Sequence, residues 1–323
     1  MSELLYLSAA DIVAAAPTAD DARNSILEAF AAMHHGRAVS PPKQTHDLNG
    51  SLSFQSRMAS WQEKGFAAIK WLGLFPVPPG LNSPGIHATI ILNECATGRP
   101  LAVMEGNVLT GIRTAAMSAA AAVRLAQPDA KRIGIVGCGL QARYHLTALK
   151  AAVPSLCDIV AFSRSRSSAD ALVAEAQRQG WTGQSSDRAE DAVHDCDVVV
   201  TTVPMAPGFQ PFLDPAWISA GTFVAAVDIG RSWKPNGLRA LDVLVTDSHE
   251  QQAESPPLAP GLGPRGTFDA DLAELAASVH PGRTHAQHRT MFLFRGLGIA
   301  DLAIASAIYR VARERGLGTI LPV

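Results

Sequence analysis

Two hydrophobic patterns divide the chain. In its first third, apolar and polar residues alternate in short runs, and a longer stretch, Thr18–Arg37, has apolar residues at helical spacing. The alternating runs are Ser51–Met58, Gly65–Leu72, His87–Asn93 and Pro100–Glu105. Alternation of this kind is typical of strands with one buried face. The pattern therefore predicts a mainly antiparallel sheet with one or two helices packed on it.

From residue 131 the pattern changes to short β-branched runs that alternate with helical stretches. The expected strands are Ile133–Val136, Asp158–Ser163, Asp197–Val203, Thr222–Arg231 and, as the last one, Leu241–Asp247. Continuous apolar strands separated by helices indicate a parallel sheet that is covered on both faces. We therefore expect an α/β fold with a Rossmann-type doubly wound sheet in this region.

A glycine-rich turn follows the first of these strands. Gly137 and Gly139 lie between the strand and a helix that begins near Ala142, and Leu140 and Gln141 complete the turn. In the dinucleotide fingerprint the first glycine permits the tight turn and the second lets the backbone approach a pyrophosphate, while a small third residue lets helix and strand pack closely. The turn predicts a dinucleotide site, although strand–turn–helix links also occur without a ligand.

The second strand of the doubly wound sheet ends in a polar turn without a carboxylate. NAD-binding proteins usually carry Asp or Glu here for the ribose 2′-hydroxyl. This chain has Ser163, Arg164, Ser165 and Arg166 instead. Because a guanidinium binds a phosphate through two hydrogen bonds, the turn favours NADP(H), with NAD(H) through weaker contacts as the alternative. Thr202 and Val203 end another strand at the edge where such sheets bind ligands.

Composition narrows the possible partners. The chain has 323 residues, of which 47% are hydrophobic and 17% charged, and its net charge is −2. These values are typical of a globular protein with a large core and give no reason to expect a nucleic-acid partner. We also expect no membrane span, because we find no apolar run of roughly 18 residues, and no signal peptide. Four scattered cysteines and three dispersed histidines (His280, His285 and His288) indicate reduced thiols, a cytoplasmic location and no metal site.

Three cations stand out in the first third. Lys70 lies between Ile69 and Trp71 in an alternating strand, which is also compatible with a lysine on a solvated face. Arg113 is expected in the first turn of a helix that begins near Thr110, where a cation opposes the helix dipole, so it is better placed to face an anion. Lys43 follows two prolines and by itself looks like a loop residue.

Several motifs, in order along the chain, resemble those of the ornithine cyclodeaminase/mu-crystallin family. They are Lys70–Leu72, Thr97–Gly106, Thr110–Ala116, Gly137–Ala142, Gly282–Thr284 and Asp301–Ala303. The resemblance implies a discontinuous α+β substrate-binding and dimerisation domain with an antiparallel sheet, formed by residues 1–118 and 297–323. It further implies an NAD(P)-binding Rossmann domain formed by residues 119–296. It also implies a homodimer in which the two antiparallel sheets pair.

The resemblance also implies roles for individual residues. Asp228 matches the catalytic acid/base of the family, although a turn aspartate that caps a loop is the other interpretation. Lys70 is implied as a second catalytic residue, which binds the substrate together with Lys43 and Arg113. Arg113 is implied as a contact of the cofactor as well. The expected cofactor contacts are Arg113, Thr114, Gly137, Gly139, Leu140, Gln141, Ser163, Arg164, Ser165, Thr202, Val203 and Val227.

Two positions depart from the family pattern. Phe294 replaces a serine that contacts cofactor or substrate, and Lys43 stands where cyclodeaminases typically carry arginine. Phe294, Met58 and Trp71 are candidates for the lining of the substrate pocket.

Three cations, one carboxylate and a nicotinamide suit an α-carboxylate substrate with a C–N bond. The leading hypothesis is an NADP(H)-dependent reductase or dehydrogenase of imino or amino acids, such as one that reduces the cyclic ketimine pyrroline-2-carboxylate to proline. One alternative is ornithine cyclodeaminase, which converts ornithine to proline and ammonia with recycled NAD. A second alternative is a non-catalytic, crystallin-like protein that binds NADPH.

Overall fold

A computed structural model describes residues 3–48, 52–75, 85–204, 208–238, 241–254 and 268–322. The chain divides into two compact units, residues 1–113 with 296–323 and residues 114–295. The predicted domain boundaries are 118/119 and 296/297, so both boundaries between the units come slightly earlier along the chain than predicted. The first boundary lies inside a continuous helix, where no break in the sequence pattern marks it.

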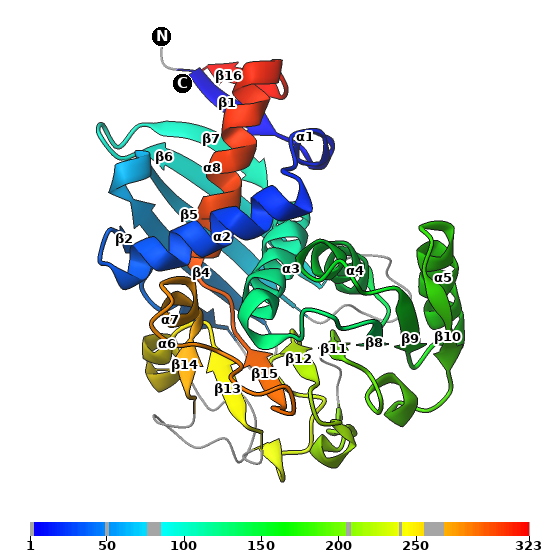
Figure 1. Cartoon of the computed structure of the whole chain (residues 1–323). Coiled ribbons are helices and arrows are strands. Elements are labelled where there is room, and N and C mark those ends of the chain that lie inside the picture. The colour runs from blue at the N-terminus through cyan, green and yellow to red at the C-terminus, as the bar shows by residue number, and fades with distance from the viewer. Residues whose placement is uncertain are drawn as a thin grey trace. The chain divides into compact units, whose positions relative to one another are not determined.

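The first unit is built on one mainly antiparallel sheet (Figure 1). Its strands follow the order β16-β1-β7-β6-β5-β4-β2, with β3 paired to β4. The bounds are β1 Glu3–Leu7, β2 Ala38–Val39, β3 Gln44–Asp47, β4 Ser53–Trp61, β5 Phe66–Leu74, β6 Ile86–Glu94, β7 Pro100–Glu105 and β16 Thr319–Pro322. Only the β1–β7 pair is parallel among the pairs that the described residues form. The expected antiparallel sheet is confirmed.

Two helices, α2 (Ala19–His34) and α8 (Gly298–Arg315), cross one face of this sheet (Figure 1). A shorter helix, α1, spans Ala9–Ala14. Thr18 caps α2 by accepting a hydrogen bond from the backbone of Asp21, and α8 ends at Gly316, whose φ of +67° suits glycine. Alternation along β5 buries Lys70 and Leu72 on the helix-covered face and leaves Trp71 on the other.

The second unit is a doubly wound parallel sheet in the order β10-β9-β8-β11-β12-β15-β13-β14. Its strands are β8 Arg132–Val136, β9 Asp158–Phe162, β10 Thr182–Ser186, β11 Val198–Thr201, β12 Phe223–Ala226, β13 Val243–Thr246, β14 Ala270–Asp271 and β15 Thr290–Leu293. The helices are α4 Leu140–Ala152, α5 Arg166–Arg178, α6 His249–Glu254 and α7 Leu272–Ala276, with 3-10 turns at Glu190–Ala192 and Pro215–Trp217. The Rossmann-type prediction is confirmed, and β8 lies where the strand order reverses.

One prediction about this sheet is wrong. The strand at residues 243–246 is not the last, because β14 and β15 follow it, and β15 inserts between β12 and β13. The run Thr290–Leu293 has only four residues, so its apolar pattern alone does not distinguish a strand from a loop.

Helix α3 (Gly106–Leu125) corrects two further predictions. It begins at Gly106 rather than near Thr110, so Arg113 is its eighth residue and does not lie in the first turn. Gly106 is required by packing, because a Cβ there would lie 2.7 Å from the backbone of Ala88. By length and composition alone α3 is a candidate membrane span that the search for apolar runs missed, but 72% of its apolar window is buried inside the protein. Burial of this kind is typical of a core helix.

Packing between α3 and α4 buries a histidine. Ala115 and Ala119 on α3 contact Ala148 on α4. His145 is fully buried beside them, with Nε2 3.0 Å from Ser118 Oγ and Nδ1 2.8 Å from the Gln141 carbonyl oxygen. Burial lowers the pKa of His145 from 6.5 to about 4.

This histidine predicts acid-sensitive stability. The unfolded chain binds a proton near pH 6.5, whereas folded His145 does so only near pH 4, so its contribution is complete above pH 6.5 and is lost as the pH falls. We expect this group to lower the free energy of unfolding by about 2 kcal/mol between pH 8 and pH 5. Urea unfolding at both pH values measures the change. The variant His145→Gln should lose this part of the pH dependence, and an unchanged slope would contradict the assignment.

Candidate functional site

The glycine turn after β8 has the geometry of a dinucleotide loop. Gly137 has φ +92°, and a Cβ there would lie 3.0 Å from the Thr202 backbone, so this position requires glycine. Gly139 is the N-cap of α4 and has no side chain to cap the helix, while a Cβ at this position would meet nothing within 4 Å. Ala142 is fully buried. The loop therefore leaves open space in front of the first N–H groups of α4, where an anion binds favourably.

This loop forms one wall of a cavity of about 840 Å³ within the second unit. Nine of the predicted cofactor residues line it: Gly137, Gly139, Leu140, Gln141, Ser163, Arg164, Ser165, Thr202 and Val203. Phe162, Phe209 and Phe212 add apolar lining. The cavity does not include three other predicted contacts, Arg113, Thr114 and Val227. Its size, its open helix N-terminus and its aromatic wall fit a nicotinamide dinucleotide.

The turn after β9 contains two arginines, and of these only Arg164 makes no ion pair with the described residues. Arg166 pairs with Asp170 at 2.9 Å and with Asp187 at 2.6 Å, so it is already neutralised. Arg164 is exposed, lines the cavity and makes no ion pair with the residues that the structure describes. A 2′-phosphate would therefore meet Arg164 and the hydroxyls of Ser163 and Ser165, and not two arginines as the sequence suggested.

A buried ion cluster lies in the first unit. Lys70 is only 1% exposed, and its Nζ donates to Asp301 Oδ1 at 2.6 Å and to Thr110 Oγ1 at 3.3 Å. The alternative of a solvated lysine is thus excluded. Arg113 Nε lies 3.1 Å from the same Asp301 oxygen. Asp301 belongs to the first turn of α8, where the helix dipole favours a carboxylate.

Arg57 is a further cation of this cluster. The β4–β5 register places Arg57 directly opposite Lys70, so both side chains emerge on one face of the sheet. A Cβ at Gly296 would lie 2.5 Å from Arg113 Nη1 and 2.9 Å from Arg57 Nη1, which shows how closely the two guanidiniums approach this glycine. Gly296 has φ +86°, so both its conformation and its neighbours require glycine.

Sequence reasoning assigned no role to Arg57 or Asp301. An arginine in an alternating strand was the available signal for Arg57. For Asp301 the available signal was the Asp301–Ala303 motif. This motif is one of those that resemble the family, but it does not indicate which side chain Asp301 contacts.

The cluster carries more positive than negative charge. In the part of the chain that the structure describes, Lys70, Arg57 and Arg113 are grouped around the carboxylate of Asp301. Burial and the Arg113 charge hold the pKa of Lys70 well below its usual range, although Asp301 opposes them. The pKa of Asp301 is lowered by Lys70 and Arg113 against the opposing effect of burial, so this carboxylate stays ionised. An arrangement of this kind suits a bound anion such as a substrate carboxylate.

Lys43 lies immediately before β3 and is partly exposed. Gln44 pairs with Ser56, so continuing this register by one residue brings Lys43 alongside Arg57. Its predicted role in substrate binding stays a prediction.

Asp228 follows β12 at the carboxyl edge of the second sheet. It is 4% exposed, and its Oδ1 accepts a hydrogen bond from Thr201 Oγ1 at 2.8 Å, while Oδ2 accepts one from Ser232 Oγ. Burial raises its pKa to about 6 against the lowering effect of both hydroxyls. The next residue, Ile229, has φ +63°, a strained conformation for a β-branched residue. Such strain is often found at functional sites.

The three residues proposed to line a substrate pocket have other environments. Trp71 is 49% exposed on the open face of the first sheet, where it stacks on Phe54 with 5.3 Å between ring centroids. Met58 is also exposed. Phe294 is buried and stacks on Phe292 at 4.5 Å. Met58 and Trp71 emerge on the face opposite Lys70, because positions that differ by an odd number of residues alternate between faces.

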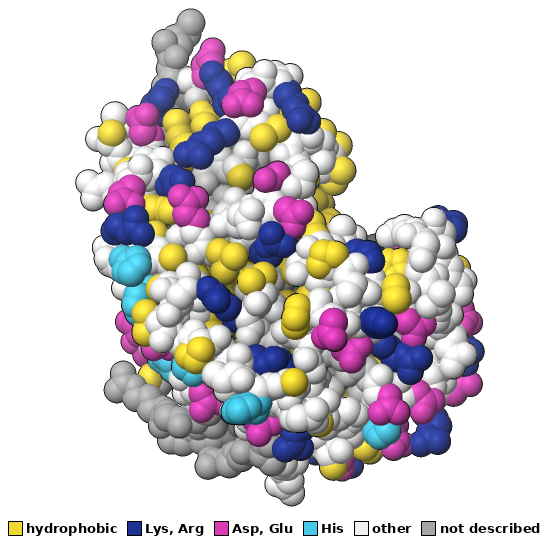
Figure 2. Space-filling view, viewed as in Figure 1, with side chains coloured by type: hydrophobic (Ala, Val, Ile, Leu, Met, Phe, Trp, Pro, Cys, Tyr) yellow, Lys and Arg dark blue, Asp and Glu magenta, His cyan; other side chains and the backbone are white. Residues whose placement is uncertain are grey.

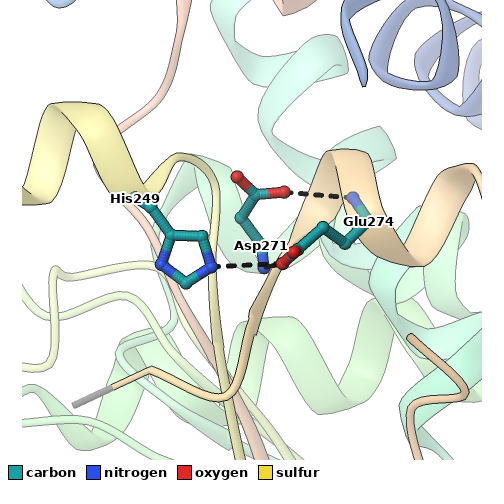
Figure 3. A group of neighbouring side chains, drawn as sticks. All are labelled: His249, Asp271 and Glu274. Atoms are coloured by element: carbon teal, nitrogen blue, oxygen red, sulfur yellow. Dashed lines mark hydrogen bonds and ion pairs between the residues drawn. The ribbon is translucent and has the colours of Figure 1, made fainter. Parts of the chain in front are cut away.

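One group of side chains in the second unit has ligand types that could hold a metal (Figure 3). His249, Asp271 and Glu274 place three candidate ligand atoms within 4.8 Å of one another. Asp271 and Glu274 form a capping box at the start of α7, and Glu274 also contacts His249 Nε2 at 3.1 Å. These contacts explain the group as a helix cap. The predicted lack of a metal site stays a prediction.

Comparison with known proteins connects these observations. The family model of the ornithine cyclodeaminase/mu-crystallin family matches residues 4–316. The chain belongs to this family. Alanine dehydrogenase of Archaeoglobus fulgidus is 31% identical over 312 residues, which cover 93% of this chain and 92% of that protein.

Two solved structures of the family resemble the fold throughout. One is an archaeal alanine dehydrogenase dimer with bound NAD, with a TM-score of 0.87, 27% identity and 99% of each chain covered. The other is Delta(1)-pyrroline-2-carboxylate reductase of Thermococcus litoralis in complex with NADH and L-proline. It has a TM-score of 0.89 and 27% identity, with 98% of this chain and 99% of that chain covered.

Proposed function

We propose that the protein is an NADP(H)-dependent reductase or dehydrogenase of imino or amino acids, with cyclic ketimines such as pyrroline-2-carboxylate as the leading substrates. The observation that carries this proposal is the buried cluster of Lys70, Arg57 and Arg113 around one carboxylate, since its excess positive charge suits an α-carboxylate. The relatives that act on alanine and on pyrroline-2-carboxylate support it, because both substrates carry nitrogen on the carbon next to a carboxylate.

In this proposal the cofactor, the cations and the carboxylate have different chemical roles. The nicotinamide nucleotide, when bound, supplies or accepts a hydride. Lys70 holds the substrate carboxylate together with Arg57 and Arg113, and polarises the C=N bond. Asp228 supplies or relays the proton that the nitrogen needs, since a carboxyl group with a pKa of about 6 is partly protonated near neutral pH. Ser232 and Thr201 orient its carboxylate.

A pair of assays on one purified sample tests the function. Oxidation of NADPH, and of NADH for comparison, is followed with pyrroline-2-carboxylate, and ornithine with catalytic NAD is assayed for proline and ammonia. Rapid oxidation of NADPH without turnover of ornithine supports the proposal. Proline and ammonia from ornithine without net cofactor change would establish the cyclodeaminase alternative. Binding of NADPH without turnover of any imino or amino acid would establish the crystallin-like one.

Preference for NADP(H) is proposed on Arg164 and its neighbouring hydroxyls. The variant Arg164→Ala should lower kcat/KM with NADPH about 10- to 100-fold, because a hydrogen-bonded charge pair to the 2′-phosphate is lost, and should leave NADH almost unaffected. Steady-state kinetics with both cofactors measure the ratio. Arg166→Ala is the matched control, since Arg166 already pairs with Asp170 and Asp187. Equal loss with both cofactors would contradict the preference.

We also propose a homodimer formed through the open face of the first sheet. A cross-strand row on this face runs from Tyr6 through Val103, Ile91 and Ile69 to Met58. Tyr6, Ile91 and Met58 are between 37% and 41% exposed, and Trp71 adds to the patch. Such an exposed apolar area is typical of an interface, and the archaeal alanine dehydrogenase relative is a dimer. Light scattering on the purified chain tests this, and a monomer at micromolar concentration contradicts it.

The proposed setting is cytoplasmic and the proposed partner a small molecule. All four cysteines are unpaired, as in most proteins of reducing compartments. On the face shown in Figure 2, Lys and Arg side chains are interspersed with Asp and Glu, without the single-signed area that nucleic-acid binding requires.

A further inference from the structure

Arg143 forms hydrogen bonds to two carbonyl oxygens of the glycine loop. It lies in the first turns of α4, and its Nη1 donates to the carbonyl oxygens of Cys138 and Gly139, each at 3.2 Å. Its Nε donates to Glu175 Oε2 on α5 at 2.8 Å. One guanidinium thus connects the loop to a carboxylate on a neighbouring helix. Both side chains are about one-third exposed, and neither is needed by the catalytic scheme above.

The carbonyl groups of Cys138 and Gly139, which accept these hydrogen bonds, determine the direction of the N–H groups that follow them. In a trans peptide the C=O and the N–H of the following residue point in opposite directions. Since the carbonyls of Cys138 and Gly139 point to Arg143, the N–H groups of Gly139 and Leu140 point away from it. Both residues line the dinucleotide cavity, and a Cβ on Gly139 would project into open space.

We propose that Arg143 is a positioning residue that orients the N–H groups of Gly139 and Leu140 toward the pyrophosphate of the nucleotide, with Glu175 holding the guanidinium in place. This inference rests on the proposed binding of a nicotinamide dinucleotide. Arg143 acts through the loop and does not itself contact the ligand. Glu175 is the second positioning residue, because without its carboxylate the guanidinium has fewer partners that hold it against the loop.

The variants Arg143→Met and Glu175→Gln separate orientation from simple attraction. If Arg143 attracts phosphate only through its charge, Glu175→Gln removes an opposing negative charge and should tighten NADPH binding. If Arg143 orients the loop, Glu175→Gln should weaken it. We expect both variants to raise the NADPH dissociation constant, by about tenfold for Arg143→Met, because well-aligned N–H donors to the pyrophosphate are lost. Arg143→Lys should recover only part of the affinity, since an ammonium lacks the planar fork.

A ligand without a pyrophosphate provides the second readout. Adenosine 2′-phosphate should bind the variants and the wild type equally, because it does not reach the loop N–H groups. The kcat at saturating NADPH should change less than twofold, so the effect appears in KM. Arg188→Met, which removes an exposed arginine paired with Glu190 in the same unit, is the matched control.

The outcomes distinguish the inference from the function on which it rests. Unchanged or tighter NADPH binding in Glu175→Gln, or equal losses for NADPH and adenosine 2′-phosphate, would overturn the role of Arg143 while leaving the reductase intact. A wild-type protein that binds neither NADPH nor NADH would overturn the proposed function and this inference together. Thermal unfolding of each variant identifies losses that come from global destabilisation.

Discussion

Replacing Lys70 with methionine is expected to lower kcat/KM for the imino acid by about 10³-fold or more. The ammonium is the most buried cation of the cluster and donates directly to Asp301 and Thr110. Methionine has a similar length but no charge, so the substrate carboxylate loses a partner and the C=N bond loses its polarising group. Losses of 10²- to 10⁴-fold are typical when a group of this kind is removed. Steady-state kinetics with purified variant and wild type measure the effect.

Two controls make this result specific. Lys64→Met removes a partly exposed lysine from the same unit, where it pairs with Glu28, and should leave kcat/KM within about twofold. The Lys70→Met protein should bind NADPH with wild-type affinity, because the described residues that line the nucleotide cavity all belong to the second unit. Retention of more than a tenth of the wild-type kcat/KM would show that Lys70 does not bind or polarise the substrate.

Replacing Asp301 with asparagine is expected to destabilise the protein by about 3 to 5 kcal/mol. The carboxylate is 1% exposed and is the shared acceptor of Lys70 and Arg113. Without it, Lys70 loses its buried ion-pair partner and Arg113 loses a carboxylate contact, and removal of one member of a buried ion pair is one of the most costly changes in a protein interior. Asparagine is nearly isosteric, so the loss reports charge and not volume. Urea unfolding at constant pH measures the free energy of unfolding.

An exposed ion pair provides the comparison for this variant. Asp20→Asn breaks the contact with Arg23 at the start of α2 and should cost at most about 1 kcal/mol. The double variant Lys70→Met with Asp301→Asn should recover part of the stability, because the cation that pairs with Asp301 at 2.6 Å is then removed together with it. If Asp301→Asn unfolds at the wild-type urea concentration, the cluster is not charged as described here.

The cofactor site could be predicted to a large extent because its signals are local. Gly137, Gly139 and Ala142 lie within one turn: Gly137 is required by its backbone conformation, Ala142 is fully buried, and a Cβ at Gly139 would project into open space. The residues after β9 follow from the same reasoning, since the end of the second strand lies beside this turn in a parallel sheet. Arg166 is the exception, because its two carboxylate partners come from other parts of the fold.

The substrate cluster could be predicted only in part. Lys70 and Arg113 were identified, but the reason given for Arg113 was wrong, because α3 begins at Gly106, where the Glu105 carboxylate accepts hydrogen bonds from the backbone of Asn107 and Val108. Asp301 lies 231 residues from Lys70, so no local pattern connects them. Arg57 becomes visible only when the β4–β5 register is known.

The sequence by itself determined the class of fold, the family and the nucleotide loop, because hydrophobic periodicity and glycine spacing act over a few residues. The tertiary structure decided which charges are buried together, since burial and ion pairing depend on strand register and on a helix from the other end of the chain. It also decided that Lys70 faces the core and Trp71 the open face: alternation separates the two faces, but only the packing of α8 shows which one is covered.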